Sequence, residues 1–518
     1  MQPKQCIAII DSIKAYAKQN PTEAQVYEDW FQAVVNLRDA LPQDKRFDAY
    51  KYSGELRSVC AAMMGKMKTG EDVAKVYDII GRTYLFEAKD VFDSYCIYLE
   101  WNRAPEKKFY QPRRKVLKTV ANALQDLADD RLDLLAISMP PGCGKTALAI
   151  FYLTWLGGRS PDEPMLTGSH SNSFVRGVYD ECLRIFDKDG EYLWNDVFPD
   201  VTVSNTNAKD CRIDLGKRKR FETLEFTSIG TGNAGLYRAS TLLYCDDLVS
   251  GIEVALSKPR LDKLWETYTT DLRQRKIGNK CKELHIATRW SVHDVIGRLE
   301  QNYGDSDRNR FIVMPAMNEK DESNFDYDYG VGYSTETLRK QREVMDEMSW
   351  KALYMNQPVE REGLLFPADE LRYFNGVLPD GEPDRKLMVM DIAWGGGDFT
   401  ACPIAYVYGD AVFIPDLVFN NGDKTVTRPE VVGKIIQHKI NVVRGEANNG
   451  GDEYCDVVDS QLRQQGYHCS VRSQRAPSGQ SKLSRIIQYA PDIKRFYFLD
   501  EKHQSKEYKA FMEQVTMF

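Results

Sequence analysis

The stretch from Met139 to Thr146, MPPGCGKT, collects residue types that bind phosphate. The apolar run Leu132 to Ile137 precedes it and Ala147-Leu148-Ala149 follows, so the pattern predicts a strand, a glycine turn and a helix. The N–H groups of such a loop and of the helix start form a concavity for the phosphates of ATP. The residues expected to bind the nucleotide here are Pro141, Gly142, Cys143, Gly144, Lys145 and Thr146.

Within this loop, Lys145 is expected to reach the outer phosphates and Thr146 to hold Mg²⁺. The loop departs from G-x-x-x-x-G-K-[ST] at Met139, where the first glycine belongs. A chance glycine turn between a strand and a helix is the alternative interpretation.

Two adjacent carboxylates end a second apolar run, Thr241 to Cys245. A strand that ends in two acids is what an ATPase needs opposite its phosphate loop, because one acid binds Mg²⁺ and its neighbour polarises the attacking water. We assign Asp246 to the metal and Asp247 to the water. Taken alone, a strand that ends in Asp-Asp is more often a turn or a helix cap, but its place after a phosphate loop favours the catalytic interpretation.

A third strand, Glu283 to Ala287, ends in Thr288, which we expect to sense the γ-phosphate. An arginine must also offset charge in the transition state, and Arg238, Arg289 or an arginine of a neighbouring subunit are the candidates. Upstream of the loop, Gln111 is placed to pair with the adenine base, although a surface helix start explains it equally well.

Further carboxylates end two strands in the C-terminal third of the chain. Asp391 closes the apolar run 387–392, and Glu446 ends a run that begins at Ile440. Acids on neighbouring strand ends can hold two Mg²⁺ or Mn²⁺ ions, of which one activates water and the other stabilises the leaving oxygen of a phosphodiester. Asp398 is a further candidate ligand, and Asn449 is a candidate for positioning a phosphate. Either acid alone is more often a cap or a turn.

The elements that must position these residues belong to a soluble chain of 518 residues, enough for roughly three domains, with 42% hydrophobic and 28% charged residues. Eleven scattered cysteines without a C-x-x-C pair predict reduced thiols, with neither a disulfide framework nor a zinc site. No apolar run reaches the length of a membrane span, and the N-terminus does not read as a signal peptide.

The net charge of −7 argues against indiscriminate binding of nucleic acid, so any such binding must use local basic surfaces. The run Lys217-Arg-Lys-Arg220 is one candidate for contacts with DNA phosphates, and a solvated hairpin is the blander interpretation. Residues 1–105 repeat apolar positions at helical spacing and predict an accessory helical module.

Several of these motifs together resemble a known family. The run Leu242 to Val249, then Trp265, Leu272 and Arg273, and then His285 to Leu299 resemble large terminase subunits, the DNA-packaging motors of tailed bacteriophages. The passage Trp350 to Phe366 looks like the segment that leads from their ATPase to their nuclease. The patterns D-x-x-x-G-G-G-D from Asp391 and E-A-N-N-G-G from Glu446 are similar to those of the terminase nuclease.

The resemblance implies a multidomain α/β fold. We expect a helical module over residues 1–105, a P-loop ATPase with a mainly parallel sheet over 106–360, a linker over 361–380 and an RNase H-like nuclease over 381–518. The family's third nuclease carboxylate is expected beyond Phe518, which predicts an incomplete nuclease metal site and weak cutting.

The function so implied is ATP-driven translocation of double-stranded viral DNA into a procapsid, with cutting of the concatemer. The expected partners are a small terminase subunit, the portal protein and further copies of the chain in a ring, without a membrane. The expected location is the host cytoplasm and, transiently, the procapsid, but not the mature virion. The alternatives are a helicase-nuclease of repair or defence and a non-enzymatic DNA scaffold with a degenerate ATPase. A helicase needs a second motor domain, and residues 300–380 of this chain show no second nucleotide-binding sheet pattern.

Overall fold

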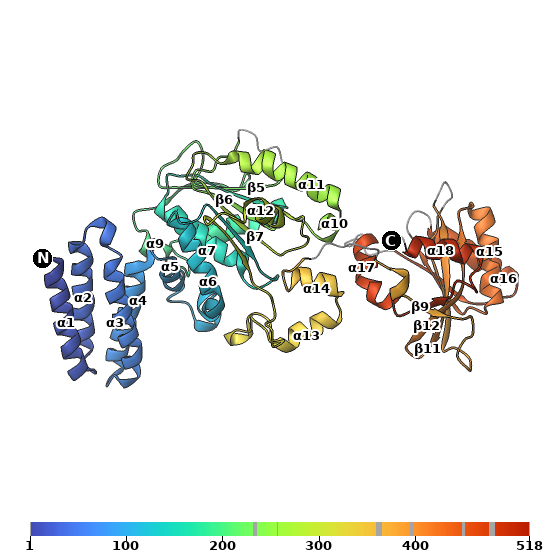
Figure 1. Ribbon diagram of the computed structural model, residues 1–518, viewed down its shortest axis with the longest axis horizontal. Coiled ribbons are helices and arrows are strands. Elements are labelled where there is room, and N and C mark those ends of the chain that lie inside the picture. The colour runs from blue at the N-terminus through green and yellow to red at the C-terminus, as the bar shows by residue number, and fades with distance from the viewer. Residues whose placement is uncertain are drawn as a thin grey trace. The chain divides into compact units, whose positions relative to one another are not determined.

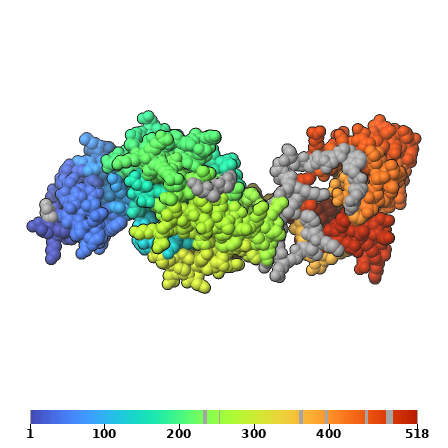
Figure 2. All heavy atoms as spheres, turned by 90° about the horizontal axis from the view of Figure 1, so that it is seen from above, coloured from blue at the N-terminus to red at the C-terminus, as the bar shows by residue number. Residues whose placement is uncertain are grey.

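A computed structural model describes residues 2–230, 236–255, 257–358, 365–393, 398–447, 451–475 and 482–516. The chain divides into two compact units. Unit 1 comprises residues 1–343 and 348–359, and unit 2 comprises Val344–Glu347 and residues 360–518. Figures 1 and 2 colour unit 1 from blue to yellow and most of unit 2 from orange to red.

Unit 1 begins with helices, as predicted for residues 1–105. Four of them lie side by side as a bundle (Figure 1). The core between them is apolar and includes the fully buried side chains of Val34, Leu56 and Ile79. A fifth helix packs instead in the core of the following sheet. The five helices are α1 (Pro3–Gln19), α2 (Ala24–Ala40), α3 (Asp48–Met63), α4 (Gly70–Ala88) and α5 (Phe92–Leu99).

An eight-stranded sheet follows, in the order β3-β4-β5-β2-β6-β7-β1-β8. Its neighbours pair in parallel from β5 to β8, while β3-β4 and β4-β5 are antiparallel, which confirms the predicted mainly parallel sheet. The strands are β1 (Leu134–Ser138), β2 (Met165–Ser169), β3 (Val203–Asn207), β4 (Arg212–Leu215), β5 (Leu224–Ser228), β6 (Leu242–Asp246), β7 (Lys282–Ala287) and β8 (Asn309–Val313).

Both faces of this sheet are covered, so its central strands are apolar on both sides. Alternate residues of β1 enter two different cores: Leu135 packs with α6, α7 and α8, whereas Leu134 packs with α12 and the segment around Tyr268. The helices are α6 (Tyr110–Ala128), α7 (Lys145–Arg159), α8 (Asn172–Phe186), α9 (Trp194–Val197), α10 (Ile252–Ala255), α11 (Lys258–Thr267), α12 (Val295–Tyr303), α13 (Thr335–Glu343) and α14 (Glu347–Leu353).

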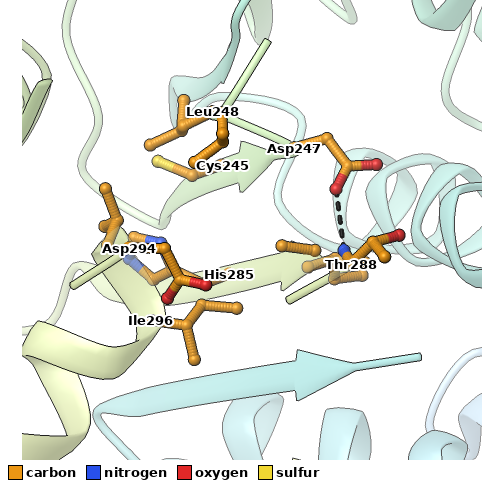
Figure 3. A pocket seen from close by; sticks show the side chains of 11 residues that line it. Cys245, Asp247, Leu248, His285, Thr288, Asp294 and Ile296 are labelled. Atoms are coloured by element: carbon orange, nitrogen blue, oxygen red, sulfur yellow. Dashed lines mark hydrogen bonds between the residues drawn. The ribbon is translucent and has the colours of Figure 1, made fainter. Parts of the chain in front are cut away.

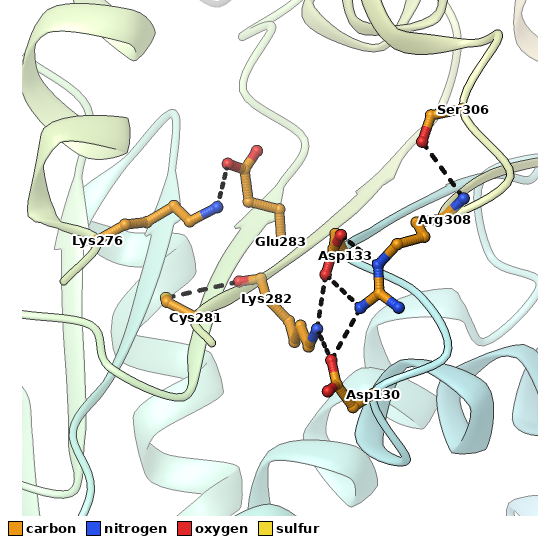
Figure 4. A network of polar contacts seen from close by, with 8 residues as sticks. All are labelled: Asp130, Asp133, Lys276, Cys281, Lys282, Glu283, Ser306 and Arg308. Atoms are coloured by element: carbon orange, nitrogen blue, oxygen red, sulfur yellow. Dashed lines mark hydrogen bonds and ion pairs between the residues drawn. The ribbon is translucent and has the colours of Figure 1, made fainter. Parts of the chain in front are cut away.

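A charged network joins the strand starts at the amino-terminal edge of the sheet (Figure 4). Lys282, the first residue of β7, pairs at 2.7 Å with Asp133, which precedes β1. Arg308, which precedes β8, pairs with the same Asp133 at 2.6 Å and with Asp130 at 2.9 Å. These pairs hold three strand starts together and place the carboxyl ends of β1 and β7 at the opposite edge.

Unit 2 contains a seven-stranded sheet in the order β14-β13-β10-β11-β12-β15-β9. Strands β10, β11 and β12 form an antiparallel meander, and β13 and β14 extend it in parallel beside β10, which is the predicted RNase H-like arrangement. The strands are β9 (Arg372–Phe374), β10 (Arg385–Met390), β11 (Thr400–Tyr408), β12 (Ala411–Asn420), β13 (Val442–Glu446), β14 (Ser470–Gln474) and β15 (Tyr497–Leu499).

The two faces of this second sheet carry separate cores. Met388 and Val443 pack with α15 and α16, while Phe413 and Phe498 pack on the other face with α17 and α18. Every residue of both cores belongs to unit 2. The helices are α15 (Lys424–Gln437), α16 (Gly451–Gln464), α17 (Lys482–Ile493) and α18 (Lys506–Thr516).

All eleven cysteines lie in the described residues and are free thiols, as the sequence predicts. Ten are buried and Cys469 is half-buried. Across the described residues, no helix combines the length and the apolar character that crossing a membrane requires.

Candidate nucleotide and metal sites

The loop between β1 and α7 needs glycine at two positions. Gly142 has φ +73° and Gly144 has φ +91°, a region that other residues rarely adopt. A Cβ atom at Gly142 would also lie 2.7 Å from the hydroxyl of Tyr333, and one at Gly144 would lie 2.7 Å from the ring of Phe109. Met139, in place of the first glycine, is fully buried in the core and leaves this geometry intact.

The loop ends in a lysine that joins two other strand ends. The ammonium of Lys145 donates a 2.6 Å hydrogen bond to the hydroxyl of Thr288, directly after β7, and lies 3.5 Å from Asp247 Oδ2, directly after β6. The side chain of Lys145 is only 7% exposed. Three of the predicted residues therefore meet at the carboxyl edge of the sheet.

Asp247 and Thr288 are also linked to each other (Figure 3). The backbone N–H of Thr288 donates a 2.8 Å hydrogen bond to Asp247 Oδ1. The backbone of Asp247 has φ +40°, and its carbonyl accepts a 2.7 Å hydrogen bond from Nδ1 of His170. The carboxylate is thus turned toward Lys145 by its own backbone and by the end of the neighbouring strand β2.

Asp246 is the last residue of β6 and is completely buried. Tyr244, two residues earlier on the same face of the strand, donates a hydrogen bond to Asp246 Oδ2. Among the described residues Oδ1 has no hydrogen-bond partner. Burial, followed by the charge of Asp247, raises the pKa of the Asp246 carboxyl, while Tyr244, Lys145 and Thr146 oppose that rise.

A buried carboxylate oxygen without a donor is costly unless a cation or a water satisfies it. The hard oxygen donors Asp246 and Thr146 suit Mg²⁺ bound beside nucleotide phosphates. These two residues therefore fit the predicted metal.

Aromatic residues lie beside the loop. Phe109 caps α6 and touches Gly144, and the guanidinium of Arg113 stacks over both Phe109 and Tyr327. Gln111 lies in the first turn of α6 with an exposed side chain. The side chains closest to Gly144 are those of Phe109 and Arg113.

The two candidate arginines do not join this site. Arg238 precedes β6, and its N–H donates to Glu225 near the start of β5, so it lies at the amino-terminal edge of the sheet. Arg289 follows Thr288, but its guanidinium is buried and pairs at 3.0 Å with Asp294, the N-cap of α12. The assignment of Arg238 as a catalytic arginine within its own subunit is therefore corrected, because the length of strand β6 separates it from Lys145.

In unit 2, Asp391 and Glu446 come together at one sheet edge. Strands β10 and β13 are parallel neighbours with Met390 opposite Gly445, so the next residue of each strand is an acid. Asp391 is exposed and exchanges two 2.9 Å backbone hydrogen bonds with Ala401, and Glu446 is half-buried. A Cβ at Gly451 would lie 1.9 Å from the carbonyl oxygen of Glu446, so this glycine lets α16 start directly against the strand end.

The structure does not show the other two nuclease candidates, Asp398 and Asn449, joining Asp391 and Glu446. Asp398 is exposed and precedes β11, and Asn449 lies outside the described residues. Within the described ranges, no group of three or more His, Cys, Asp or Glu side chains is arranged to hold a metal ion. The described site therefore consists of two carboxylates on neighbouring strand ends.

Neither a family model nor a curated protein matches this chain. Comparison with solved structures finds phage packaging proteins. The structure resembles large terminases. The large terminase of a thermophilic bacteriophage, in complex with ADP, has a TM-score of 0.41 and 13% identity, over 79% of this chain and 91% of that one. That of bacteriophage HK97 has a TM-score of 0.33 and 12% identity, over 74% and 85% of the two chains.

The likeness to large terminases is one of fold, and the assignment of residues rests on the geometry described above. That geometry includes residues that the sequence analysis does not single out. Tyr244 is detectable from its spacing of two residues before Asp246. His170 and Asn356 leave no such signal: Asn356 accepts a 3.2 Å hydrogen bond from the N–H of Arg289 and donates a 3.3 Å hydrogen bond to the carbonyl of Met314, which is distant in sequence.

Proposed function

We propose that this chain hydrolyses ATP at the loop between β1 and α7. The observation that carries the proposal is the contact of Lys145 with both Thr288 and Asp247, beside the buried carboxylate of Asp246. These side chains come from the ends of β6 and β7 and from the loop that follows β1, so only the parallel sheet brings them together. A chance glycine turn would not need the two acids and the threonine at the same edge.

Each residue has a role that follows from its position. When nucleotide binds, Lys145 leaves Thr288 and Asp247 and contacts oxygens of the outer phosphates. Its positive charge then offsets the negative charge of those phosphates. Asp247 orients the attacking water, and its bond to the N–H of Thr288 transmits the state of the phosphate to the end of β7. Thr146 and Asp246 would hold Mg²⁺, which would supply positive charge to offset the charge that develops on the phosphates.

We further propose that Asp391 and Glu446 form the metal-dependent nuclease centre of unit 2. Two carboxylates at the ends of parallel neighbours can share one divalent ion, and a second ion needs further ligands. Because only two acids converge in the described residues, we expect weak binding of Mg²⁺ or Mn²⁺ and little DNA cleavage by this 518-residue chain.

Together the two centres support a large terminase subunit that moves double-stranded DNA into a procapsid and cuts the concatemer. The order of the motifs along the chain supports this assignment. Its partners are then DNA, a small terminase subunit, the portal protein and further copies of the chain in a ring, in the host cytoplasm. A helicase-nuclease is a weaker candidate, since the sheet of unit 2 contains an antiparallel meander and does not repeat the sheet of unit 1.

The deciding experiment measures ATP turnover by the purified chain, with and without DNA, and then packaging of DNA into purified procapsids. DNA-stimulated turnover with protection of packaged DNA from nuclease is the expected result. Turnover without packaging would favour a helicase-nuclease, and the absence of both nucleotide binding and turnover would leave only a DNA-binding scaffold. Lys145→Ala is the matched inactive control.

A further inference from the structure

The turn between β4 and β5 and the segment before β6 carry four exposed cations, two of which lie over the ring of Phe221. Lys217, Arg218 and Arg220 of the turn are exposed, as is Arg238. The guanidinium carbons of Arg220 and Arg238 lie 5.3 and 4.6 Å from the ring centroid of Phe221. We call Lys217, Arg218, Arg220 and Arg238 the basic cluster.

The turn that carries this cluster is held by a buried ion pair. Asp214 is fully buried and pairs with the ammonium of Lys219 at 2.8 Å, while its second oxygen accepts a 2.7 Å hydrogen bond from the N–H of Lys219. The same ammonium donates to the carbonyls of Leu215 and Lys217. Lys219 therefore neutralises the local acid and fixes the turn, so its neighbours remain available to solvent.

The cations of the cluster lack anionic partners. In the described part of the chain, none of the four forms an ion pair, although the chain has a net charge of −7 and many of its other Lys and Arg side chains are paired. Two guanidinium groups on one aromatic ring repel each other unless an anion lies between them. A group of unpaired cations is the electrostatic footprint of a polyanion site.

We propose that the basic cluster binds the phosphate backbone of double-stranded DNA. This inference rests on the proposed function and adds the surface where DNA is held. The cluster lies at the amino-terminal edge of the sheet, beside Glu225 at the start of β5, whereas Lys145 and Thr288 lie at the carboxyl edge. DNA at this surface leaves the nucleotide loop free, and contacts to phosphates alone carry no sequence preference.

The test measures the affinity of the full chain for a fluorescent duplex by anisotropy over a series of salt concentrations. Each phosphate contact contributes about 0.9 to the slope of log affinity against log salt. The variant Lys217→Gln/Arg218→Gln/Arg220→Gln should lower that slope by up to about 2.7 and weaken binding at low salt. The control Lys51→Gln/Lys66→Gln/Lys68→Gln removes the same charge from exposed lysines of the helical bundle and should keep the slope.

The outcomes separate this inference from the proposed function. A wild-type chain that binds no duplex contradicts the proposed function itself. A wild-type chain that binds while the triple variant keeps the full slope overturns the inference alone. The inference is also overturned if the triple variant binds DNA as well as wild type but loses ATP turnover only at protein concentrations at which the chain assembles. The cluster would then contact a neighbouring subunit.

Two further variants test the proposal if the triple variant does not fold. The single variant Arg218→Gln should lower the slope by about 0.9. The charge-conserving variant Lys217→Arg/Arg218→Lys/Arg220→Lys should keep the wild-type slope, since the slope depends on charge. A full slope in Arg218→Gln, or a reduced slope in the charge-conserving variant, contradicts the proposal. DNA-independent ATP turnover and the melting temperature serve as checks on folding.

Discussion

At the scale of single residues, the nucleotide site depends on Lys145 and Asp247. We expect Lys145→Ala to reduce ATP turnover by about 10²-fold or more, because it removes the charge that faces the phosphates. Asp247→Asn should keep nucleotide binding and lose turnover, because an amide cannot polarise the attacking water. Turnover and binding of a fluorescent ATP analogue, measured on the same samples, check both expectations.

Near-normal turnover in Asp247→Asn would assign the water-positioning role to another acid. The matched control is Asp410→Asn, which removes the same charge from an exposed residue outside unit 1 and should leave turnover unchanged.

Some of these residues can be predicted from the sequence, and the reason is local. Asp246 and Thr288 stand at the ends of apolar strands, and Lys145 follows the glycine loop after another apolar strand, so the strand pattern indicates where they meet. Tyr333 and Asn356 reach the site from segments without such a pattern. The position of Arg238 could not be predicted, because a short glycine-rich stretch does not indicate the sheet edge at which its last residue lies.

At the scale of elements, one carboxylate joins two helices beside the phosphate loop. Glu100, the C-cap of α5, is 1% exposed and accepts hydrogen bonds from the N–H groups of Phe109 and Tyr110 at the start of α6. Arg103 donates to the same carboxylate at 2.7 Å. Because Phe109 touches Gly144, the position of the loop depends on this cap.

We expect Glu100→Gln to lower the free energy of unfolding by about 1–3 kcal/mol, since a buried group loses charged hydrogen bonds. It should also weaken nucleotide binding, because Phe109 is less firmly placed. Thermal melting with and without nucleotide measures both effects. Glu191→Gln is the control: Glu191 also pairs with Arg103 but is 63% exposed, so its loss should change stability little.

A second link between elements makes the stability of unit 2 depend on pH. Burial alone would raise the pKa of Asp416 in β12, but hydrogen bonds from His438 and Lys434 of the α15 region lower it to about 2. A lowered pKa in the folded state contributes stability above the ordinary pKa of an aspartate, and this stability is lost as the pH falls toward 2.

Asp416→Asn should therefore lower the free energy of unfolding by about 1–3 kcal/mol at neutral pH. The difference from wild type should shrink below pH 4, and denaturant titrations across that range measure it. A difference that stays constant from pH 7 to pH 2 would show that the carboxylate's charge contributes nothing.

The elements themselves follow from the sequence to different degrees. The runs before the phosphate loop, Asp247 and Thr288 are confirmed as β1, β6 and β7. Strand β11 is not predicted, because Pro403 within it argues against a central strand. The antiparallel strands β3 and β4 are also missed, since β3 is only partly buried and lacks a clear apolar pattern.

At the scale of the whole molecule, the two apolar cores described in unit 2 are built from residues of unit 2. We expect a fragment that starts at about residue 361 to fold without nucleotide, because its own residues supply the two apolar cores described for it. Circular dichroism and limited proteolysis of that fragment test this. An aggregated or fully labile fragment would mean that unit 1 supplies part of the fold.

The burial of the thiols has a practical consequence at the same scale. Burial raises the pKa of Cys143 to about 12, so even the thiol of the phosphate loop is a poor nucleophile at neutral pH. Cys469 is the least buried of the eleven thiols, and it lies in unit 2. A maleimide dye should therefore label the native chain mainly at Cys469, as peptide mapping would show. With a second dye on a cysteine introduced at exposed Lys51, energy transfer would report in real time whether the two units move relative to each other while ATP is turned over.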